Sequence, residues 1–199
     1  MKAEHLRSLI REYNKERAPR LDNRLAEYRG ILSLAEVIER AGISANGKRL
    51  PHQYRIKKTV MAEVRDRILE QEEALARSRS FEAVRAIVQA CSVKGFGELT
   101  VYDTALAIAA HMGLYPERVY LHRGTKDGAR ALGLPYKAGS LSLAELPEPL
   151  RNLDPLHVEN FLCIYKNDFQ DVPRSKQASG SDCSPPDTQE GGGPAPRIC

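Results

Sequence analysis

The stretch VKGFGEL, residues 93–99, decides the predicted fold because it separates two segments with helical patterns. A helix, then apolar-x-Gly-apolar-Gly, then a second helix is the layout of a helix-hairpin-helix. Glycine has no Cβ, so Gly95 and Gly97 can form a tight turn that other residues would strain. The sequence therefore predicts a helix-hairpin-helix over about residues 81–112.

A hairpin of this kind can hold phosphates of a nucleic-acid backbone without reading the base sequence. The turn exposes main-chain N–H groups, and the N-terminus of the second helix adds partial positive charge. We expect Lys94, Gly95, Phe96 and Gly97 to form this binding site, with the lysine adding a full positive charge. The alternative is a plain turn between two packed helices, in which Phe96 fills the core.

The segments around the hairpin predict an all-α fold. Apolar residues recur at helical spacing on both sides of it, and glycine or proline separates most of the predicted helices. A long helix is expected to begin at Pro51, and residues 116–122 fit either a short helix or extended chain. The other patterns place helices near residues 6–13, 22–28, 33–41, 81–92, 98–112, 125–132 and 155–165.

The composition changes after about Val172, where Ser, Gly, Pro, Gln and Asp dominate. Such a segment cannot bury enough apolar area to offset the conformational entropy that is lost on ordering. We therefore expect one multi-helix domain over residues 1–171 and a disordered tail over 172–199. No apolar run approaches the ~20 residues that a membrane span needs, so the sequence favours a cytoplasmic protein with no membrane partner.

Positive charge is concentrated in the first half of the chain. Residues 1–95 hold 20 Lys and Arg against 13 Asp and Glu, a net +7, whereas the whole chain carries +4. Residues 40–62 contain no acidic side chain, which favours a surface that faces phosphates. Tyr54 in this stretch could stack on a base or belong to the core, and the charges could instead form an ordinary solvated face. The predicted phosphate contacts in this stretch are Lys48, Arg49, His52 and Arg55.

Asp103 and His122 are the candidate catalytic residues, because they are polar groups in otherwise apolar surroundings. The Asp103 carboxylate could orient the His122 imidazole and form a general acid–base pair. The structural alternative is that Asp103 pairs with Arg123 or Arg130 and that His122 caps a helix. The four cysteines lack the spacing of zinc ligands, so we predict no metal site and no cofactor.

Residues 81–134 resemble the core of the helix-hairpin-helix DNA glycosylases. The shared order is a hairpin at Gly95-Phe96-Gly97, a helix, a linker with proline, and a helix that ends at Leu132-Gly133-Leu134. The resemblance implies DNA binding and a helical fold. It places His122 where the family has its catalytic aspartate, and Leu99 where the lysine-dependent members have their nucleophile. A neutral imidazole stabilises a developing sugar cation poorly, so these departures argue against base excision.

Sequence-independent binding of DNA, or of structured RNA, is the function that the sequence favours most. The first alternative is an enzyme that acts on nucleic acid, with Asp103 and His122 as its polar centre. The second alternative is a structural or protein-interaction domain, in which the hairpin only packs two helices together.

Overall fold

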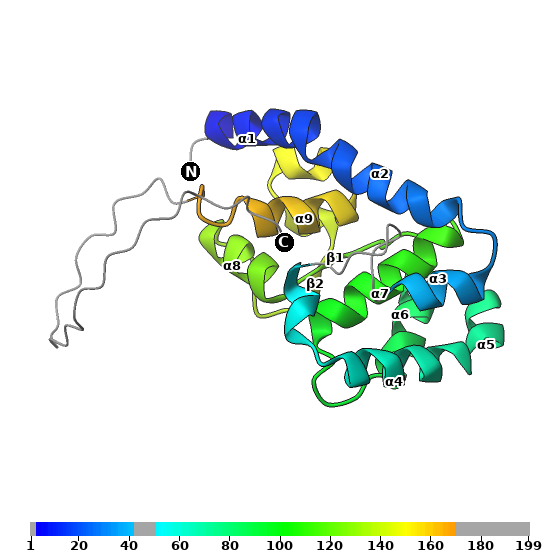
Figure 1. The fold of residues 1–199 in the computed structure, drawn as a ribbon. Coiled ribbons are helices and arrows are strands. Elements are labelled where there is room, and N and C mark those ends of the chain that lie inside the picture. The colour runs from blue at the N-terminus through cyan, green and yellow to red at the C-terminus, as the bar shows by residue number, and fades with distance from the viewer. Residues whose placement is uncertain (1–2, 42–50, 170–199) are drawn as a thin grey trace, which may run out of the picture.

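The computed structural model describes residues 3–41 and 51–169 (Figure 1). In this part 67% of the residues are helical, and the only strands form a two-stranded sheet, which confirms the predicted all-α class. The α-helices are α1 (Ala3–Glu16), α2 (Ala18–Arg29), α3 (Leu34–Ala41), α4 (Lys58–Leu69), α5 (Glu72–Ala76), α6 (Phe81–Ala90), α7 (Glu98–His111), α8 (Arg123–Ala131) and α9 (Pro155–Ile164). The short elements are the 3-10 helices η1 (Pro51–Arg55), η2 (Leu143–Glu145) and η3 (Glu148–Asn152) and the strands β1 (Val119–Tyr120) and β2 (Ser140–Leu141).

The helices bury two apolar clusters. The first cluster surrounds α7, and α2, α3, α4 and α6 contribute side chains to it. The second cluster is built by α1, α8, α9 and the two strands. In Figure 1, α1 and α2 run along one side of the molecule, α4 and α5 lie on the opposite side, and α7 lies between them. The continuous arm of α1 and α2 therefore contributes to both clusters.

Several helix ends lie where local sequence signals place them. Ser80 caps α6, and its Oγ accepts a main-chain N–H at 3.2 Å. Gly133 follows α8 with a φ of 73°, the left-handed conformation typical of a glycine after a helix. Ser142 and Glu145 form a capping box around η2, in which the Glu145 carboxylate accepts the Ser142 N–H at 2.7 Å.

Two predicted boundaries are wrong. The helix α2 begins at Ala18, four residues before its predicted start, because Pro19 lies in its first turn, where a missing N–H costs no hydrogen bond. The long helix predicted from Pro51 is divided into η1 and α4. Lys57, between them, has an extended backbone with φ −60° and ψ 139°. The apolar residues Ile56, Val60, Val64 and Ile68 recur every fourth position across the break, so the sequence periodicity does not reveal it.

Residues 116–122 are extended rather than helical over their central part. The strand β1 pairs antiparallel with β2, with Val119 opposite Leu141 and Tyr120 opposite Ser140. The chain then passes directly into α8, with His122 as the N-cap residue. The short sheet therefore fixes where α8 begins.

The helices α8 and α9 approach each other unusually closely. A Cβ built on Gly128 would lie 2.1 Å from the main-chain oxygen of Leu162, and one built on Gly124 would lie 2.5 Å from Sγ of Cys163. Real side chains do not fit at either distance. The pair of glycines, one turn apart, therefore permits this helix contact.

The arm of α1 and α2 is tied to the start of α9 by a polar junction. The hydroxyl of Tyr13 shares a hydrogen bond with Nδ1 of His157 at 2.9 Å, and Nε2 of the same ring lies 3.2 Å from Oδ1 of Asp22. Tyr13 also contacts the ring of Phe161 edge to face, with centroids 5.6 Å apart. One histidine of α9 thus contacts both helices of the arm.

The predicted tail, residues 172–199, lies outside the described residues, and the division of the chain into one domain and a tail stays a prediction. Among the residues that are described, no helix is both long enough and apolar enough to cross a bilayer.

We expect Gly128→Ala to destabilise the protein, because its methyl group would strike the main chain of α9. Overpacking of this kind costs about 1–3 kcal/mol. Alanine is otherwise the better helix former by about 1 kcal/mol, so a lower melting temperature in circular dichroism isolates the steric effect. Gly139→Ala is the matched control, since a Cβ there has open space. Equal melting temperatures for the two variants would contradict the close contact.

Candidate functional site

The segment predicted as a hairpin is the turn that joins α6 to α7 through residues 91–97, and the word hairpin is kept below for this turn. Gly95 has a φ of 101°, in the left-handed region that favours glycine. Gly97 is the N-cap residue of α7, and a Cβ there would meet no atom within 4 Å. The first N–H groups of a helix have no partner within it. The turn therefore presents the start of α7 beside an open surface.

Phe96 does not take the place predicted for it in the binding site. Its side chain is buried in the first apolar cluster, and its N–H donates to the Val93 carbonyl at 2.9 Å. Neither group is available to a ligand, so Phe96 is a core residue, as the alternative interpretation has it. Lys94, in contrast, is exposed, and its side chain forms no ion pair in the described part of the chain.

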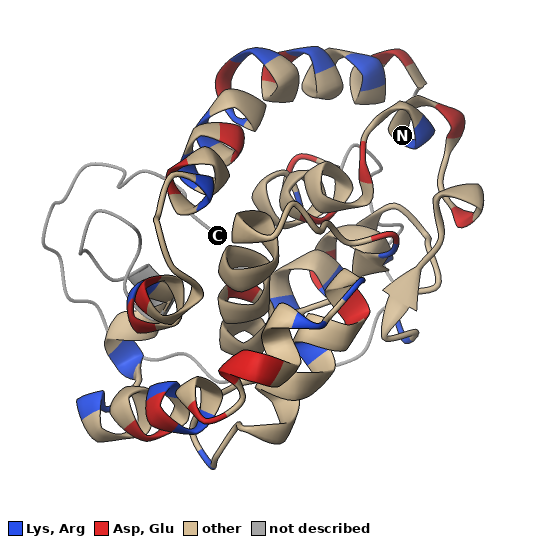
Figure 2. Ribbon diagram, turned by 90° about the vertical axis from the view of Figure 1, so that its right-hand side faces the viewer, with Lys and Arg blue, Asp and Glu red and all other residues tan. Residues whose placement is uncertain are grey.

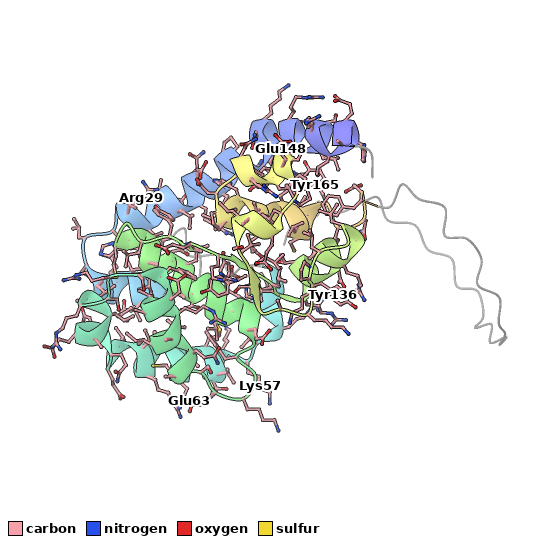
Figure 3. All side chains as sticks on the ribbon, turned by 180° about the vertical axis from the view of Figure 1, so that it is seen from behind. Arg29, Lys57, Glu63, Tyr136, Glu148 and Tyr165 are labelled. Carbon is pink, nitrogen blue, oxygen red and sulfur yellow. The ribbon has the colours of Figure 1, made fainter. Side chains whose placement is uncertain are left out.

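The first turn of α4 lies against the hairpin. A Cβ on Gly95 would be 3.8 Å from Cγ2 of Val60, so the backbone of the turn runs directly past this valine. The contact places Lys57 and Lys58, which are both exposed, at the same end of the molecule as Lys94. Figure 3 shows Lys57 at the outer edge of the molecule, with its side chain directed away from the core. We call these three lysines the basic end.

The structure describes only part of the acid-free stretch. Arg55 is exposed, as a phosphate contact requires. Tyr54 is 67% exposed, so the alternative that it belongs to the core is wrong. Lys48 and Arg49 lie outside the described residues, and so does the side chain of His52.

The structure contains a cavity of about 280 Å³. Leu99 of α7, two residues past the hairpin in the sequence, contributes to its wall. Helices α2, α7, α8 and α9 provide the lining. The cavity brings together Asp103 and His122, the two candidate catalytic residues, which lie 19 positions apart in the sequence. Side chains that the sequence analysis did not connect with them also line it. These additional polar residues are Arg17, Arg20, Arg24, Glu159 and Asn160; Thr125, which belongs to the polar cluster that the sequence predicts around Asp103 and His122, lines the cavity too.

Glu159 contributes a buried carboxyl group to the cavity. The hydroxyl of Thr125 donates a hydrogen bond to its Oε1 at 2.8 Å. Burial raises the pKa of Glu159 to about 8, the charge of Asp103 acts in the same direction, and the bond from Thr125 and the charge of Arg24 oppose the shift. At pH 7 this carboxyl is therefore mostly protonated and is itself a hydrogen-bond donor.

His122 lies against the ring of Tyr102, with centroids 4.6 Å apart. Burial lowers the pKa of His122 to about 4, although the charges of Asp103 and Glu98 act in the opposite direction. The imidazole is therefore neutral at pH 7. Its Nε2 is buried and has no hydrogen-bond partner among the described residues.

The structure bears on the structural alternative for this pair through His122 and the two arginines. His122 occupies the N-cap position of α8 but makes no side-chain cap hydrogen bond. Arg130, one of the two proposed partners of Asp103, forms an ion pair with Asp127 of its own helix. Arg123, the other, is exposed and does not line the cavity.

Three arginines of the arm line the cavity beside these groups. Arg17, Arg20 and Arg24 are three and four residues apart, so they share one face of the helix. The buried Nε of Arg17 has no hydrogen-bond partner among the described residues. Arg20 and Arg24 form no ion pair with any described residue. Figure 2 shows that both signs of charge occur along α1 and α2. The charged residues that this pair of helices contributes to the cavity wall, in contrast, are all arginines.

The sequence analysis missed Glu159 and the arginines, although both leave a signal. Glu159 interrupts an apolar helical run, and a carboxyl on such a face is rarely buried without a partner. The arginines recur at a spacing of three and four residues, which places them on one face of a helix and is visible in the sequence. Neither signal indicates which other elements share the site, because that depends on how the helices pack.

Comparisons of this chain with protein-family models, with curated proteins and with solved structures found no match. In the residues that the structure describes, no group of three or more His, Cys, Asp or Glu side chains could hold a metal ion. Function is therefore inferred from the hairpin, the basic end and the cavity.

The cavity combines three arginines with two groups that can exchange protons. At neutral pH the imidazole of His122 is a possible proton acceptor, while the protonated carboxyl of Glu159 is a possible donor. Arginine side chains bind phosphate and carboxylate groups through their planar set of donors. Sites of this composition suit ligands that carry one anionic group and a polar, uncharged body.

We expect Glu159→Gln to change how the stability of the protein depends on pH. The folded protein keeps a proton on Glu159 up to about pH 8, whereas the unfolded chain releases it near the ordinary value of 4.5. Between these values the free energy of unfolding of the wild type falls as pH rises, by on the order of 1 kcal/mol per pH unit, and the loss is complete above pH 8. Glutamine is neutral at every pH and keeps an acceptor for Thr125, so the variant gains stability relative to the wild type across this range.

Urea unfolding of both proteins over this pH range measures the effect. Glu16→Gln, at an exposed glutamate of α1, is the control and should follow the wild type. If the curves of wild type and Glu159→Gln stay parallel, the buried carboxyl does not hold its proton.

Proposed function

We propose that this protein binds nucleic acid through backbone contacts at the hairpin, without reading the base sequence. The observation that carries the proposal is the contact between Gly95 and Val60, because it brings the start of α4 beside the turn. Two segments that are distant in the sequence thus contribute the exposed lysines of the basic end. They border an N-cap glycine with open space in front of it, which is the arrangement that a phosphate group needs.

Glu98 works against this site. It is exposed in the first turn of α7, where a negative charge stabilises the helix through its positive end. The same charge repels a phosphate that approaches the turn. The balance of three lysines against one glutamate favours binding of moderate strength that depends on ionic strength.

Fluorescence anisotropy with labelled single- and double-stranded DNA and RNA over a salt series tests the proposal. Phosphate contacts release counterions, so the logarithm of affinity falls linearly with the logarithm of salt concentration, by about 0.9 per contact on duplex DNA and about 0.7 on single strands. Unrelated sequences of one length should bind equally. Absence of binding to all four at low salt would contradict the proposal and support the structural alternative.

We expect Gly97→Val to weaken nucleic-acid binding and leave the fold intact. Gly97 has a φ of −74° and no neighbour near its Cβ position, so valine fits without strain but projects into the space in front of the turn. Anisotropy measures affinity, and far-ultraviolet circular dichroism checks the fold. Gly139→Val, at an equally open glycine outside the hairpin, is the control. Unchanged affinity in Gly97→Val would place the nucleic acid elsewhere.

We expect Glu98→Gln to strengthen nucleic-acid binding, whereas Gly97→Val weakens it. Removal of this charge takes away repulsion at the turn, so affinity for nucleic acid should rise at low salt, and the difference should shrink as salt rises. Glu63→Gln is a matched control on the exposed side of α4, where the carboxylate pairs with Arg67. Equal or lower affinity for Glu98→Gln would show that phosphates do not approach the start of α7.

An enzyme acting on nucleic acid is the second candidate, and one specific observation favours it. The resemblance to DNA glycosylases assigns the nucleophile position to Leu99 and the aspartate position to His122, and both side chains line the same cavity. The cavity also holds Asp103 and Glu159, so it has groups for proton transfer beside the proposed nucleic-acid surface.

We nevertheless expect no excision of damaged or mismatched bases by the pure protein. Leu99 cannot act as a nucleophile, and a neutral imidazole at residue 122 gives little stabilisation to a sugar cation. Incubation with duplexes that carry uracil, oxidised or mismatched bases, followed by alkaline cleavage, measures abasic sites directly. Abasic sites that disappear in Asp103→Asn would make the enzyme the leading function.

A further inference from the structure

The cavity carries an excess of positive charge at neutral pH. Arg17, Arg20 and Arg24 line it together with two carboxyl groups, and burial keeps one of these, Glu159, mostly protonated. Arg20 and Arg24 have no ion-pair partner in the part of the chain that the structure describes. Guanidinium groups that face a cavity without carboxylate partners bind anions, and phosphate groups match their geometry.

The wall of the cavity also offers polar atoms that lack partners. His122 is 4% exposed, and its buried Nε2 has no hydrogen-bond partner among the described residues. The same holds for the buried Oδ1 of Asn160. Buried polar atoms without partners cost free energy, which a ligand with matching donors and acceptors recovers. The amide oxygen of Asn160 requires a donor, such as an amino group.

The volume limits what can enter. A cavity of about 280 Å³ lies at the lower end of the range of ligand pockets, about 300–1,000 Å³. That is room for one planar ring system of the size of a nucleobase, but not for a second nucleotide. Polar atoms on such a ring can reach the wall while a phosphate group stays at the arginines.

We propose that this cavity binds a single nucleotide with a terminal phosphate, with the phosphate at Arg20 and Arg24 and the base edge at His122 and Asn160. The nucleotide is either free or the phosphorylated end of a strand. This site is separate from the hairpin, which faces internal phosphates of a backbone, and it stands whether or not the hairpin binds nucleic acid.

The charges around Glu159 give the site a defined pH dependence. Arg24 faces it from α2, Asp103 from α7, and the hydroxyl of Thr125 from α8, while neutral His122 shares the cavity. A terminal phosphate becomes a dianion above about pH 6, and Glu159 becomes an anion above about pH 8. Affinity is therefore highest between these two values and falls at higher pH, where the carboxylate repels the ligand. Glu159→Gln removes only the fall at high pH.

Isothermal titration calorimetry with the four deoxynucleoside 5′-monophosphates, and with the corresponding nucleosides, tests the site in the full chain. We expect the monophosphates to bind and the nucleosides to bind at least about tenfold more weakly, as loss of a charge-assisted contact implies. The double variant Arg20→Ala/Arg24→Ala should lose the same factor. Arg29→Ala, which removes one positive charge at the far end of α2, is the control and should bind like the wild type. Melting temperatures confirm that the variants fold.

Two further arms separate the sources of the ligand and the two sites. If an octamer with a 5′-phosphate binds more tightly than the same octamer with a 5′-hydroxyl, the ligand is the phosphorylated end of a strand. If the two octamers bind equally while the monophosphates bind, the ligand is the free nucleotide. Gly97→Val should leave monophosphate binding unchanged even where it weakens strand binding. The proposal is overturned if monophosphates bind no better than nucleosides, if Arg29→Ala loses as much affinity as the double variant, or if Gly97→Val abolishes monophosphate binding.

Discussion

The close approach of α8 to α9 is the constraint on which the candidate site depends. Packed helices normally keep their axes about 8–10 Å apart, at a distance set by the side chains in the contact. Gly124 and Gly128 remove the side chains that would strike α9. The hydroxyl of Thr125 consequently reaches the carboxyl of Glu159 across the two helices. The same contact holds the start of α8 in place, and with it His122.

Burial then sets the protonation of the cavity in a single direction. It raises the pKa of the Glu159 carboxyl and lowers that of the His122 imidazole, so both groups lose their charge at neutral pH. The arginines of α2 keep theirs, because a guanidinium does not deprotonate in proteins. Removal from water thus leaves the cavity with uncharged polar groups, Glu159 and His122, on one side and with charged arginines on the other. The proposed nucleotide site rests on this separation rather than on any single residue.

The sequence predicted those features that depend on neighbours within a few residues. The helices on either side of the hairpin, the cap at Ser80 and the glycine that follows α8 all arise from local hydrogen bonds and backbone angles. Asp103 and His122 could also be chosen from the sequence as candidate site residues, because polar residues in apolar patterns are visible without a structure. It did not predict that Glu159 joins them or that α2 supplies arginines, since those contacts depend on helix packing. Phe96 shows the same limit: its burial depends on the core it enters, not on the turn that contains it.

The cavity lies between helices of two different apolar clusters, and its polar side chains belong to neither cluster, whereas Leu21 of its wall is a core residue of the first. The polar residues of the wall can therefore change without opening a hole in either core, whereas Leu21 and the glycines of α8 cannot. A framework of this kind lets chemistry diverge while architecture persists. The region between the two apolar clusters is thus the part of this molecule in which substitutions, natural or engineered, can change specificity at the least cost to packing.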